Sequence, residues 1–182
     1  MRKLKITEMQ RPDIDTFRRL EKLPIVVLLD DIRSMNNVGS VLRTADAFRL
    51  EAVLLCGITA IPPHPDIHKT ALGAEDSVYW QSFKDPHEAV WLYKEKGYRI
   101  CALEQADGSL SLEKLSVDVN EGYVLILGNE VFGVKQSLID LCDCCLEIPQ
   151  FGTKHSLNVS VAAGIALWQM ASPLLPSLFL AQ

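Results

Sequence analysis

Short apolar runs alternate with amphipathic stretches along most of the chain. Each run is apolar at consecutive positions and rich in Val, Ile and Leu, which is typical of a strand buried on both faces of a parallel sheet. The clearest runs predict strands at residues 25–29, 52–56, 99–103, 123–127 and 144–148, with a shorter strand at 78–80.

The segments between these runs carry helical signals. Asp85 and Pro86 are suited to the cap and first turn of a helix, and Gly97 is suited to its end. Apolar side chains between Val38 and Phe48 recur at the spacing of one helix face. This alternation of strand and helix favours an α/β fold, a mostly parallel sheet flanked by helices on both faces. The predicted helices span residues 38–48, 86–96, 135–141 and about 157–170.

The first 23 residues differ from the rest of the chain in charge. They contain seven basic and four acidic side chains, whereas the whole chain has a net charge of −5. We therefore expect a basic N-terminal leader at residues 1–23. Since no linker or repeat follows, we expect a single domain at residues 24–182. A leader of this kind either contacts phosphates or is a solvated segment, and the sequence leaves both interpretations open.

Composition limits the classes of protein to which the chain can belong. Its 182 residues, 48% of them hydrophobic, are enough to bury a core. The negative net charge, taken alone, argues against a nucleic-acid-binding protein. No apolar run approaches the roughly 18 residues of a membrane span, and no apolar segment follows the charged N-terminus as it does in a signal peptide. We therefore expect a cytoplasmic protein that does not contact a membrane.

The cysteines and histidines give no metal-binding pattern. The cysteine count, five, is odd in a chain without a secretory signal, which predicts free thiols in a reducing compartment. The cysteine cluster at residues 142–145 lacks a second pair at zinc-finger spacing, so we interpret it as structural. His64 and His68 have helical i, i+4 spacing, but prolines flank His64 and the glutamate of H-E-x-x-H is absent. We expect a loop there, and no metal centre.

Three polar loops that contain glycine are expected at the sheet edge where ligands bind in α/β folds. Gly128 and Gly133 have the spacing of a phosphate loop. However, Val134 stands where such a loop needs lysine, and Glu130 would repel an anion. A cofactor without phosphate is therefore expected beside this loop, where glycine lets a ligand approach the backbone. Ser156 is a suitable N-cap for the last predicted helix. The three loops span residues 36–43, 128–133 and 149–158.

Taken together, these loops resemble the motifs of the SpoU family of RNA ribose 2′-O-methyltransferases, which belongs to the SPOUT class of α/β-knot proteins. The first loop matches N-x-G-x-x-x-R-[ST] at Asn37–Thr44. The second motif corresponds to Leu127–Gly133 and the third to Ile148–Ala162. The resemblance covers roughly residues 25–171, with the three motifs in the family's order.

The resemblance implies a deep trefoil knot at the C-terminal end of the fold, with S-adenosylmethionine bound in it as the cofactor. It also implies a homodimer that methylates a ribose 2′-hydroxyl of tRNA or rRNA. The residues expected to contact the cofactor through their backbone are Leu103, Gly128, Ile148 and Leu157.

The same resemblance implies a set of catalytic residues in which Arg43 is central. Because a guanidinium is effectively always protonated, we favour phosphate binding and stabilisation of the developing alkoxide over a role for Arg43 as base. Glu130 would orient either Arg43 or Asn158. The implied catalytic residues are Arg43, Asn37, Glu130, Ser156 and Asn158.

Two other functions fit parts of the sequence. A non-catalytic RNA-binding module that retains the methyltransferase fold would share the motifs, and a phosphotransferase would share the glycine spacing at residues 128–133. The presence of every candidate catalytic residue argues against the first. The missing lysine and Ser/Thr of a phosphate loop argue against the second. The motifs do not distinguish tRNA from rRNA as the substrate.

Overall fold

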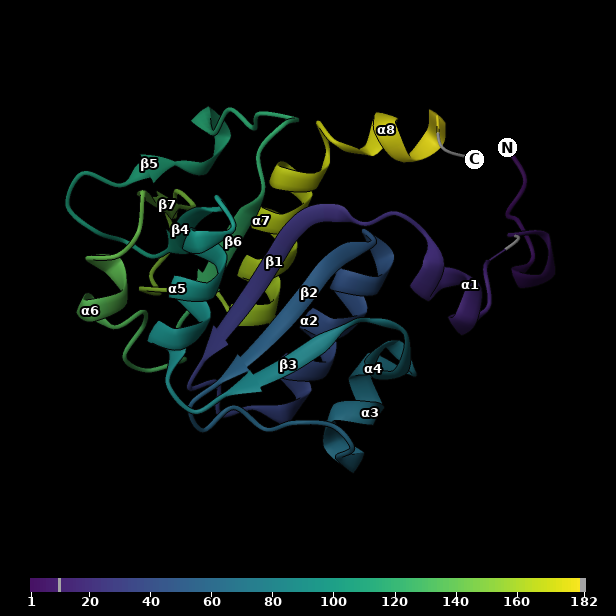
Figure 1. The fold of residues 1–182 in the computed structure, drawn as a ribbon, viewed down its shortest axis with the longest axis horizontal. Coiled ribbons are helices and arrows are strands. Elements are labelled where there is room, and N and C mark those ends of the chain that lie inside the picture. Colours follow the sequence, from purple (N-terminus) through teal and green to yellow (C-terminus); the bar gives the residue numbers. More distant parts are fainter. Residues whose placement is uncertain (10, 181–182) are drawn as a thin grey trace.

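Seven parallel strands form one sheet, which is covered by helices on both faces (Figure 1). The structure is a computed structural model and describes residues 1–9 and 11–180. The strand order is β3-β2-β1-β6-β4-β7-β5, so strands far apart in the sequence lie side by side. The strands are β1 (Leu23–Asp30), β2 (Leu50–Cys56), β3 (Trp80–Phe83), β4 (Arg99–Leu103), β5 (Leu110–Ser111), β6 (Tyr123–Leu127) and β7 (Cys144–Glu147).

The helices divide between the two faces of the sheet. The larger core lies between the sheet and α2, α3, α4, α7 and α8, and the smaller core lies beneath α5 and α6. The α-helices are α1 (Ile14–Arg19), α2 (Met35–Ala47), α3 (Pro65–Ala71), α4 (Ala74–Ser77), α5 (Pro86–Glu95), α6 (Gln136–Ile139), α7 (Val159–Ala171) and α8 (Leu175–Leu180), and 3₁₀ turns lie at Ile6–Glu8 and Leu112–Lys114. None of the helices in this described part of the chain is long and apolar enough to cross a membrane.

Strand β1 shows why the apolar runs are continuous. Val27 and Leu29 face the larger core, whereas Val26 and Leu28 face the smaller one, and all four side chains are fully buried. Successive side chains of a strand point to opposite faces, so a strand with helices on both sides must be apolar at every position. The prediction of an α/β fold with a mostly parallel sheet is confirmed.

Several predicted boundaries agree closely with the structure. The strands expected at residues 99–103 and 123–127 match β4 and β6 at both ends. Asp85 caps α5, since its Oδ1 accepts a hydrogen bond from His87 N at 3.0 Å. The short strand expected at residues 78–80 is displaced, because β3 begins only at Trp80.

The prediction of a loop around His64 and His68 is wrong, because residues 65–71 form helix α3. Pro65 occupies the first turn, and His64 Nδ1 accepts a hydrogen bond from Asp66 N at 3.2 Å. Proline is favoured at the first position of a helix, so the residue that indicated a loop begins the helix instead. His68 pairs with Glu75, their Nδ1 and Oε1 atoms being 2.5 Å apart.

The order of the strands brings the C-terminal third of the chain back into the sheet. Strand β7 lies between β4 and β5 although the chain reaches it only after β6. Helix α7 follows and packs beside α2, where the rings of Phe48 and Trp168 have centroids 5.7 Å apart. As a result, the segments that follow β4, β6 and β7 meet at one edge of the sheet.

Candidate cofactor and catalytic site

A cavity of about 690 Å³ opens where the carboxyl ends of β4, β6 and β7 meet the start of α7. This is the edge of a parallel sheet at which ligands bind, and the volume is within the usual range for a small-molecule site. The structure brings together here all of the residues expected to contact the cofactor: Leu103, Gly128, Ile148 and Leu157.

The loop after β6 folds back on itself and leaves no room for a side chain at its first glycine. A Cβ atom on Gly128 would lie 2.2 Å from the backbone carbon of Gly133 and from the nitrogen of Val134. Asn129 stabilises the loop, because its Oδ1 accepts a hydrogen bond from Val131 N at 2.9 Å. The tight fold of this loop therefore requires glycine at position 128, and the cofactor contact predicted there stays a prediction.

Glu104 joins two walls of the cavity, and the sequence analysis did not select it. Its carboxylate accepts hydrogen bonds from Gln105 N and Val134 N, each at 2.9 Å. A Cβ atom on Gly133 would lie 2.1 Å from Glu104 Oε2, so the second glycine of the loop permits this close approach. The one signal for Glu104 in the sequence is an acidic side chain directly after a predicted strand.

The cavity is acidic. Glu104, Glu130 and Glu147 line it, and none of the described residues in its wall is Lys or Arg. Such a wall attracts cations and repels phosphate. S-adenosylmethionine carries a positive sulfonium and no phosphate, so its chemistry fits the residues present.

Glu130 connects the glycine loop to the start of α2. Its carboxylate accepts hydrogen bonds from the backbone N atoms of Arg33 (3.0 Å) and Ser34 (3.1 Å), and from Asn37 Nδ2 (3.0 Å). A negative charge is favourable at this position because the N-terminus of a helix carries a partial positive charge. Burial raises the pKa of Glu130, but these hydrogen bonds outweigh it and the pKa lies below its usual value.

Asn158 extends this chain of hydrogen bonds to α7. Its Nδ2 donates to Asn37 Oδ1 at 3.1 Å, while its Oδ1 accepts from Ser160 N at 3.0 Å. Asn158 is therefore the N-cap of α7, and the N-cap predicted at Ser156 is wrong. The helix begins later because the Asn158 side chain satisfies the free N–H groups of its first turn. Ser156 lies instead in an exposed loop at the cavity wall.

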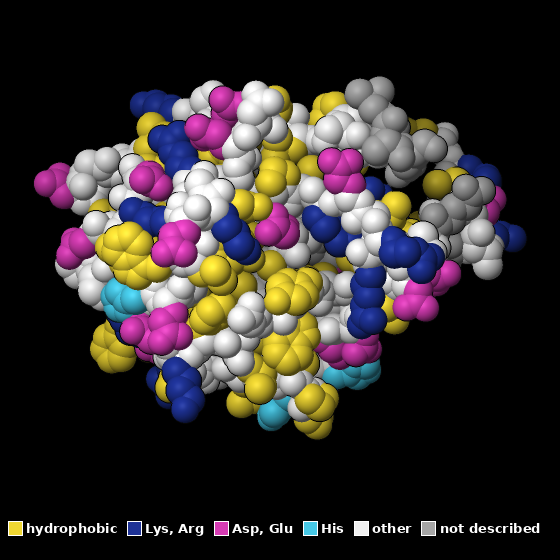
Figure 2. Space-filling model, in the orientation of Figure 1, with side chains coloured by type: hydrophobic (Ala, Val, Ile, Leu, Met, Phe, Trp, Pro, Cys, Tyr) yellow, Lys and Arg dark blue, Asp and Glu magenta, His cyan; other side chains and the backbone are white. Residues whose placement is uncertain are grey.

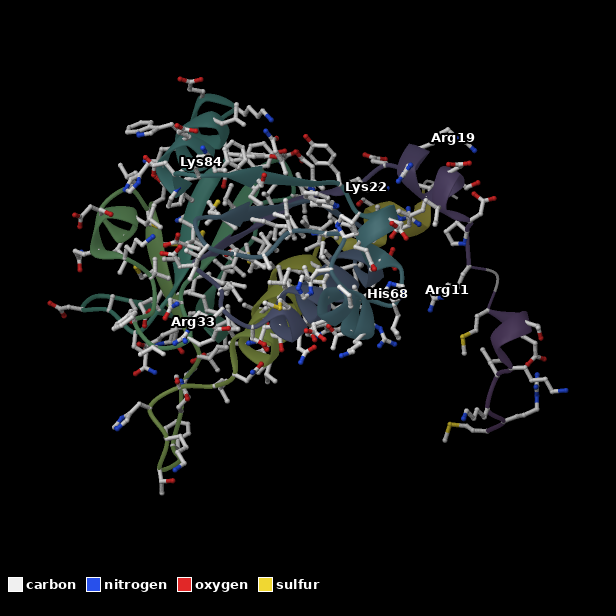
Figure 3. The ribbon with its side chains drawn as sticks, turned by 90° about the horizontal axis from the view of Figure 1, so that it is seen from below. Arg11, Arg19, Lys22, Arg33, His68 and Lys84 are labelled. Atoms are coloured by element: carbon white, nitrogen blue, oxygen red, sulfur yellow. The ribbon has the colours of Figure 1, made fainter. Side chains whose placement is uncertain are left out.

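That exposed loop, residues 150–157, projects from the body of the molecule near Arg33 (yellow-green in Figure 3). One hydrogen bond ties it to the segment after β4, from Gln105 Nε2 to the His155 carbonyl at 2.9 Å. Ser156 and His155 thus approach the cavity from the side that is open to solvent.

Arg43 lies outside this cavity. It is an exposed residue of α2 and lines two other cavities, which are bounded by α2, α3 and the N-terminal segment. Within the described part of one chain, Glu130 contacts Asn37 rather than Arg43. The fold therefore gathers Asn37, Glu130, Ser156 and Asn158 around the cavity and places Arg43 apart from them.

Lys135 follows the glycine loop and has a structural role. Its Nζ lies 3.0 Å from Asp30 Oδ1 and 2.7 Å from Asp31 Oδ2. Asn129 Nδ2 adds a hydrogen bond to the Asp31 carbonyl at 2.7 Å. Because both aspartates lie at the end of β1, these contacts anchor the glycine loop to the neighbouring strand.

Comparison with known proteins identifies relatives over most of the chain. The model of the SpoU rRNA Methylase family matches residues 24–168. A tRNA (guanosine(18)-2′-O)-methyltransferase of Thermus thermophilus is 30% identical over 164 residues, covering 90% of this chain and 82% of the relative. A 23S rRNA (guanosine-2′-O-)-methyltransferase RlmB of Nitrosomonas europaea is 32% identical over 155 residues, covering 85% of this chain but 58% of the relative.

Solved structures show the same architecture. An rRNA methyltransferase from Sinorhizobium meliloti with bound AdoMet superposes with a TM-score of 0.79 at 26% identity, covering 87% of this chain and 60% of the other. The A. aeolicus TrmH/SpoU tRNA modifying enzyme gives a TM-score of 0.79 at 22% identity over 92% of this chain and 86% of the other. With β7 inserted between β4 and β5, this likeness implies the C-terminal knot that is expected from the family resemblance. The chain belongs to the SpoU rRNA methylase family.

Proposed function

We propose that this protein transfers a methyl group from S-adenosylmethionine to a ribose 2′-hydroxyl of tRNA or rRNA. The observation that carries the proposal is the acidic cavity, which suits a cationic cofactor without phosphate. Residues of the second and third family motifs line it, and Asn37 of the first motif is hydrogen-bonded to Glu130 in its wall. The relatives named above act on tRNA in one case and 23S rRNA in the other, so both RNA classes remain in the proposal.

S-adenosylmethionine supplies, when bound, a methyl group on a sulfonium, which is a good leaving group. The protein must then hold the hydroxyl in line and favour loss of its proton. We assign the cofactor contacts to the backbone of the cavity wall. The residues assigned to this role are Leu103, Gly128, Ile148 and Leu157.

The remaining motif residues would act on the ribose. Glu130, Asn37 and Asn158 form one chain of hydrogen bonds beside the cavity, which orients the amide groups. Ser156 lies at the open side, where RNA would enter. Arg43 would supply the positive charge that stabilises the developing alkoxide.

Arg43 does not line the cavity of its own chain, so we propose that it serves the cavity of a second copy in a homodimer. Helix α7 supports this arrangement because it is apolar on both sides. Its exposed side carries Val161, Ile165 and Trp168, which are 51%, 42% and 52% exposed. A helix that is apolar all round is normally covered. Trp168 packs on Phe48, a residue of the same cavity wall as Arg43, so a copy seated on α7 would lie beside Arg43.

The function is tested by incubating the protein with labelled S-adenosylmethionine and separately purified tRNA and rRNA, followed by mapping of the methylated nucleoside. We expect label on a ribose 2′-oxygen in one of the two RNA classes. Cofactor binding without methyl transfer to either class would favour the non-catalytic RNA-binding module instead.

We expect Ile165→Asp to convert the dimer to a monomer, because it places a charge in the centre of the proposed apolar contact. Light scattering after size-exclusion chromatography measures the mass. Leu92→Asp is the matched control, since Leu92 is 37% exposed on α5 at the opposite face of the sheet. A wild-type protein that is monomeric, or an equal effect of the two substitutions, would contradict the proposed interface.

Replacing Asn158 should lower both turnover and cofactor affinity. Asn158→Ala removes the cap of α7, at a cost of about 1 kcal/mol of stability, and also removes the donor to Asn37. Asn158→Asp keeps an acceptor for the cap but places an oxygen opposite Asn37 Oδ1, so we expect α7 to stay capped with turnover lowered roughly tenfold. Steady-state kinetics and thermal melting measure the two effects. Wild-type turnover in Asn158→Asp would leave Asn158 with a capping role alone.

A further inference from the structure

A second depression lies between the N-terminal segment and helices α2, α3 and α4. It is a cavity of about 610 Å³, and it shares Arg43 and Ala47 with a neighbouring cavity that extends to Lys69. We call the two together the leader groove. Its basic lining residues are Arg11, Arg43, Arg49 and Lys69.

The N-terminal wall of this groove is attached to the body of the molecule. Phe17 of α1 is 8% exposed, and Arg18 Nε donates a hydrogen bond to the Asp76 carbonyl at 3.1 Å. Figure 3 shows Arg11 extending from the N-terminal segment toward the side of the body that carries His68, a residue of α3. Figure 2 shows dark-blue Lys and Arg side chains beside the N-terminal segment, at the right. The groove is therefore part of the folded surface.

Positive charge in the groove is only partly balanced. Lys69 pairs with Asp66 at 2.6 Å. Asp46 is the one acidic residue among the described lining residues, and its Oδ1 accepts a hydrogen bond from Ser77 Oγ at 2.6 Å. Arg11, Arg43 and Arg49 form no ion pair within the described part of the chain.

Arg49 has a backbone conformation that favours glycine. It directly follows the C-cap of α2 with φ at +55°, in the left-handed region. Glycine is the usual residue at this position because a side chain adds strain there. Arg49 shares this conformation with Asp31 and Leu72 among the described non-glycine residues, and of the three it is the one that brings a positive charge to the groove. The pKa of Lys22 is lowered by burial and further by the charge of Arg49, while Asp46 raises it. Like charges crowded in this way create a site for an anion.

We propose that the leader groove binds phosphates of the RNA backbone beside the ribose that is methylated, an inference that rests on the proposed function. The groove begins at Arg43, which is assigned to the reacting hydroxyl, and runs toward Arg11 and Arg49. An RNA strand with its ribose at Arg43 would place neighbouring phosphates along these arginines. Local positive potential of this kind is compatible with a net charge of −5 on the whole chain.

The test uses Arg49→Gly and Arg11→Ala, with bulk tRNA as the probe and fluorescence anisotropy measured over a range of NaCl concentrations. Glycine suits the backbone of residue 49, so Arg49→Gly should fold at least as well as the wild type. We expect each variant to bind tRNA about 3–10-fold more weakly and to reduce the slope of log K against log [NaCl] by about 0.7–0.9. Affinity for S-adenosylmethionine should not change, because the groove and the cofactor cavity share no lining residue.

Lys84→Ala is the matched control. It also removes one exposed positive charge, and Lys84 lies far from Arg11 in the view of Figure 3. We expect its salt slope to equal that of the wild type. If the salt slopes of Lys84→Ala, Arg49→Gly and Arg11→Ala were equal, the proposal that the leader groove binds RNA phosphates would be overturned. Methyl transfer by the wild type would be unaffected by that result. Absence of methyl transfer by the wild type on both RNA classes would instead overturn the proposed function.

Discussion

Gly128→Ala is expected to abolish cofactor binding in a protein that still folds. The new Cβ atom would lie 2.2 Å from backbone atoms of Gly133 and Val134, which have no flexible side chain to move aside. The loop must therefore open, and its backbone then loses the position from which it contacts the cofactor. We expect the Kd for S-adenosylmethionine to rise at least about 100-fold, equivalent to about 2.7 kcal/mol, and turnover to fall with it.

Calorimetric titration measures this loss, and circular dichroism with thermal melting verifies the fold. Gly152→Ala is the control, because it adds the same methyl group to another loop after a sheet strand. No atom lies within 4 Å of a Cβ built there. We expect its Kd to remain within about twofold of the wild-type value. A folded Gly128→Ala protein with wild-type affinity would show that the cofactor does not depend on this loop.

The sheet was predictable where strands are covered on both faces, as in β1 and β6, because the core then demands an apolar residue at every position. β5 has only two residues, Leu110 and Ser111, and it pairs at the sheet edge with a strand distant in sequence. Helix α3 was missed because its start depends on a histidine cap and on a proline, which the sequence also uses in turns. Local patterns carry no information on which distant strands pair.

The candidate site followed from the sequence where backbone geometry demands a particular residue. Gly128 and Gly133 were selected for their spacing, and each permits a contact closer than a side chain would allow. Glu104 was missed because its role is to bridge two segments that meet only in the folded chain. The position of Arg43 could not be inferred either, since the side chain of a helix residue faces a direction set by packing. Sequence alone thus grouped Arg43 with residues from which the fold separates it.

Arg43→Ala should lower methyl transfer at least about 100-fold, the loss typical when a preorganised charge that stabilises a developing anion is removed. Affinity for S-adenosylmethionine should stay within about twofold of wild type, because Arg43 does not line the cavity of its own chain and is assigned to the ribose hydroxyl rather than to the cofactor. Arg43→Lys keeps the positive charge but lacks the planar guanidinium with its paired N–H donors, so we expect partial RNA binding with little turnover. Single-turnover kinetics separate the chemical step from binding, and turnover near wild type in Arg43→Ala would contradict the assignment.

A mixture of Arg43→Ala and Gly128→Ala chains tests whether Arg43 serves the second copy. In a mixed dimer, the Arg43→Ala chain keeps an intact cavity and its partner keeps an intact arginine, so one site is complete. Random exchange should restore about one quarter of the wild-type rate, since half of the dimers are mixed and each has one complete site. If Arg43 instead served its own chain, no site in the mixture would be complete. Mass spectrometry of the intact dimers shows whether mixed dimers are present, and their failure to restore activity would assign Arg43 to the cavity of its own chain.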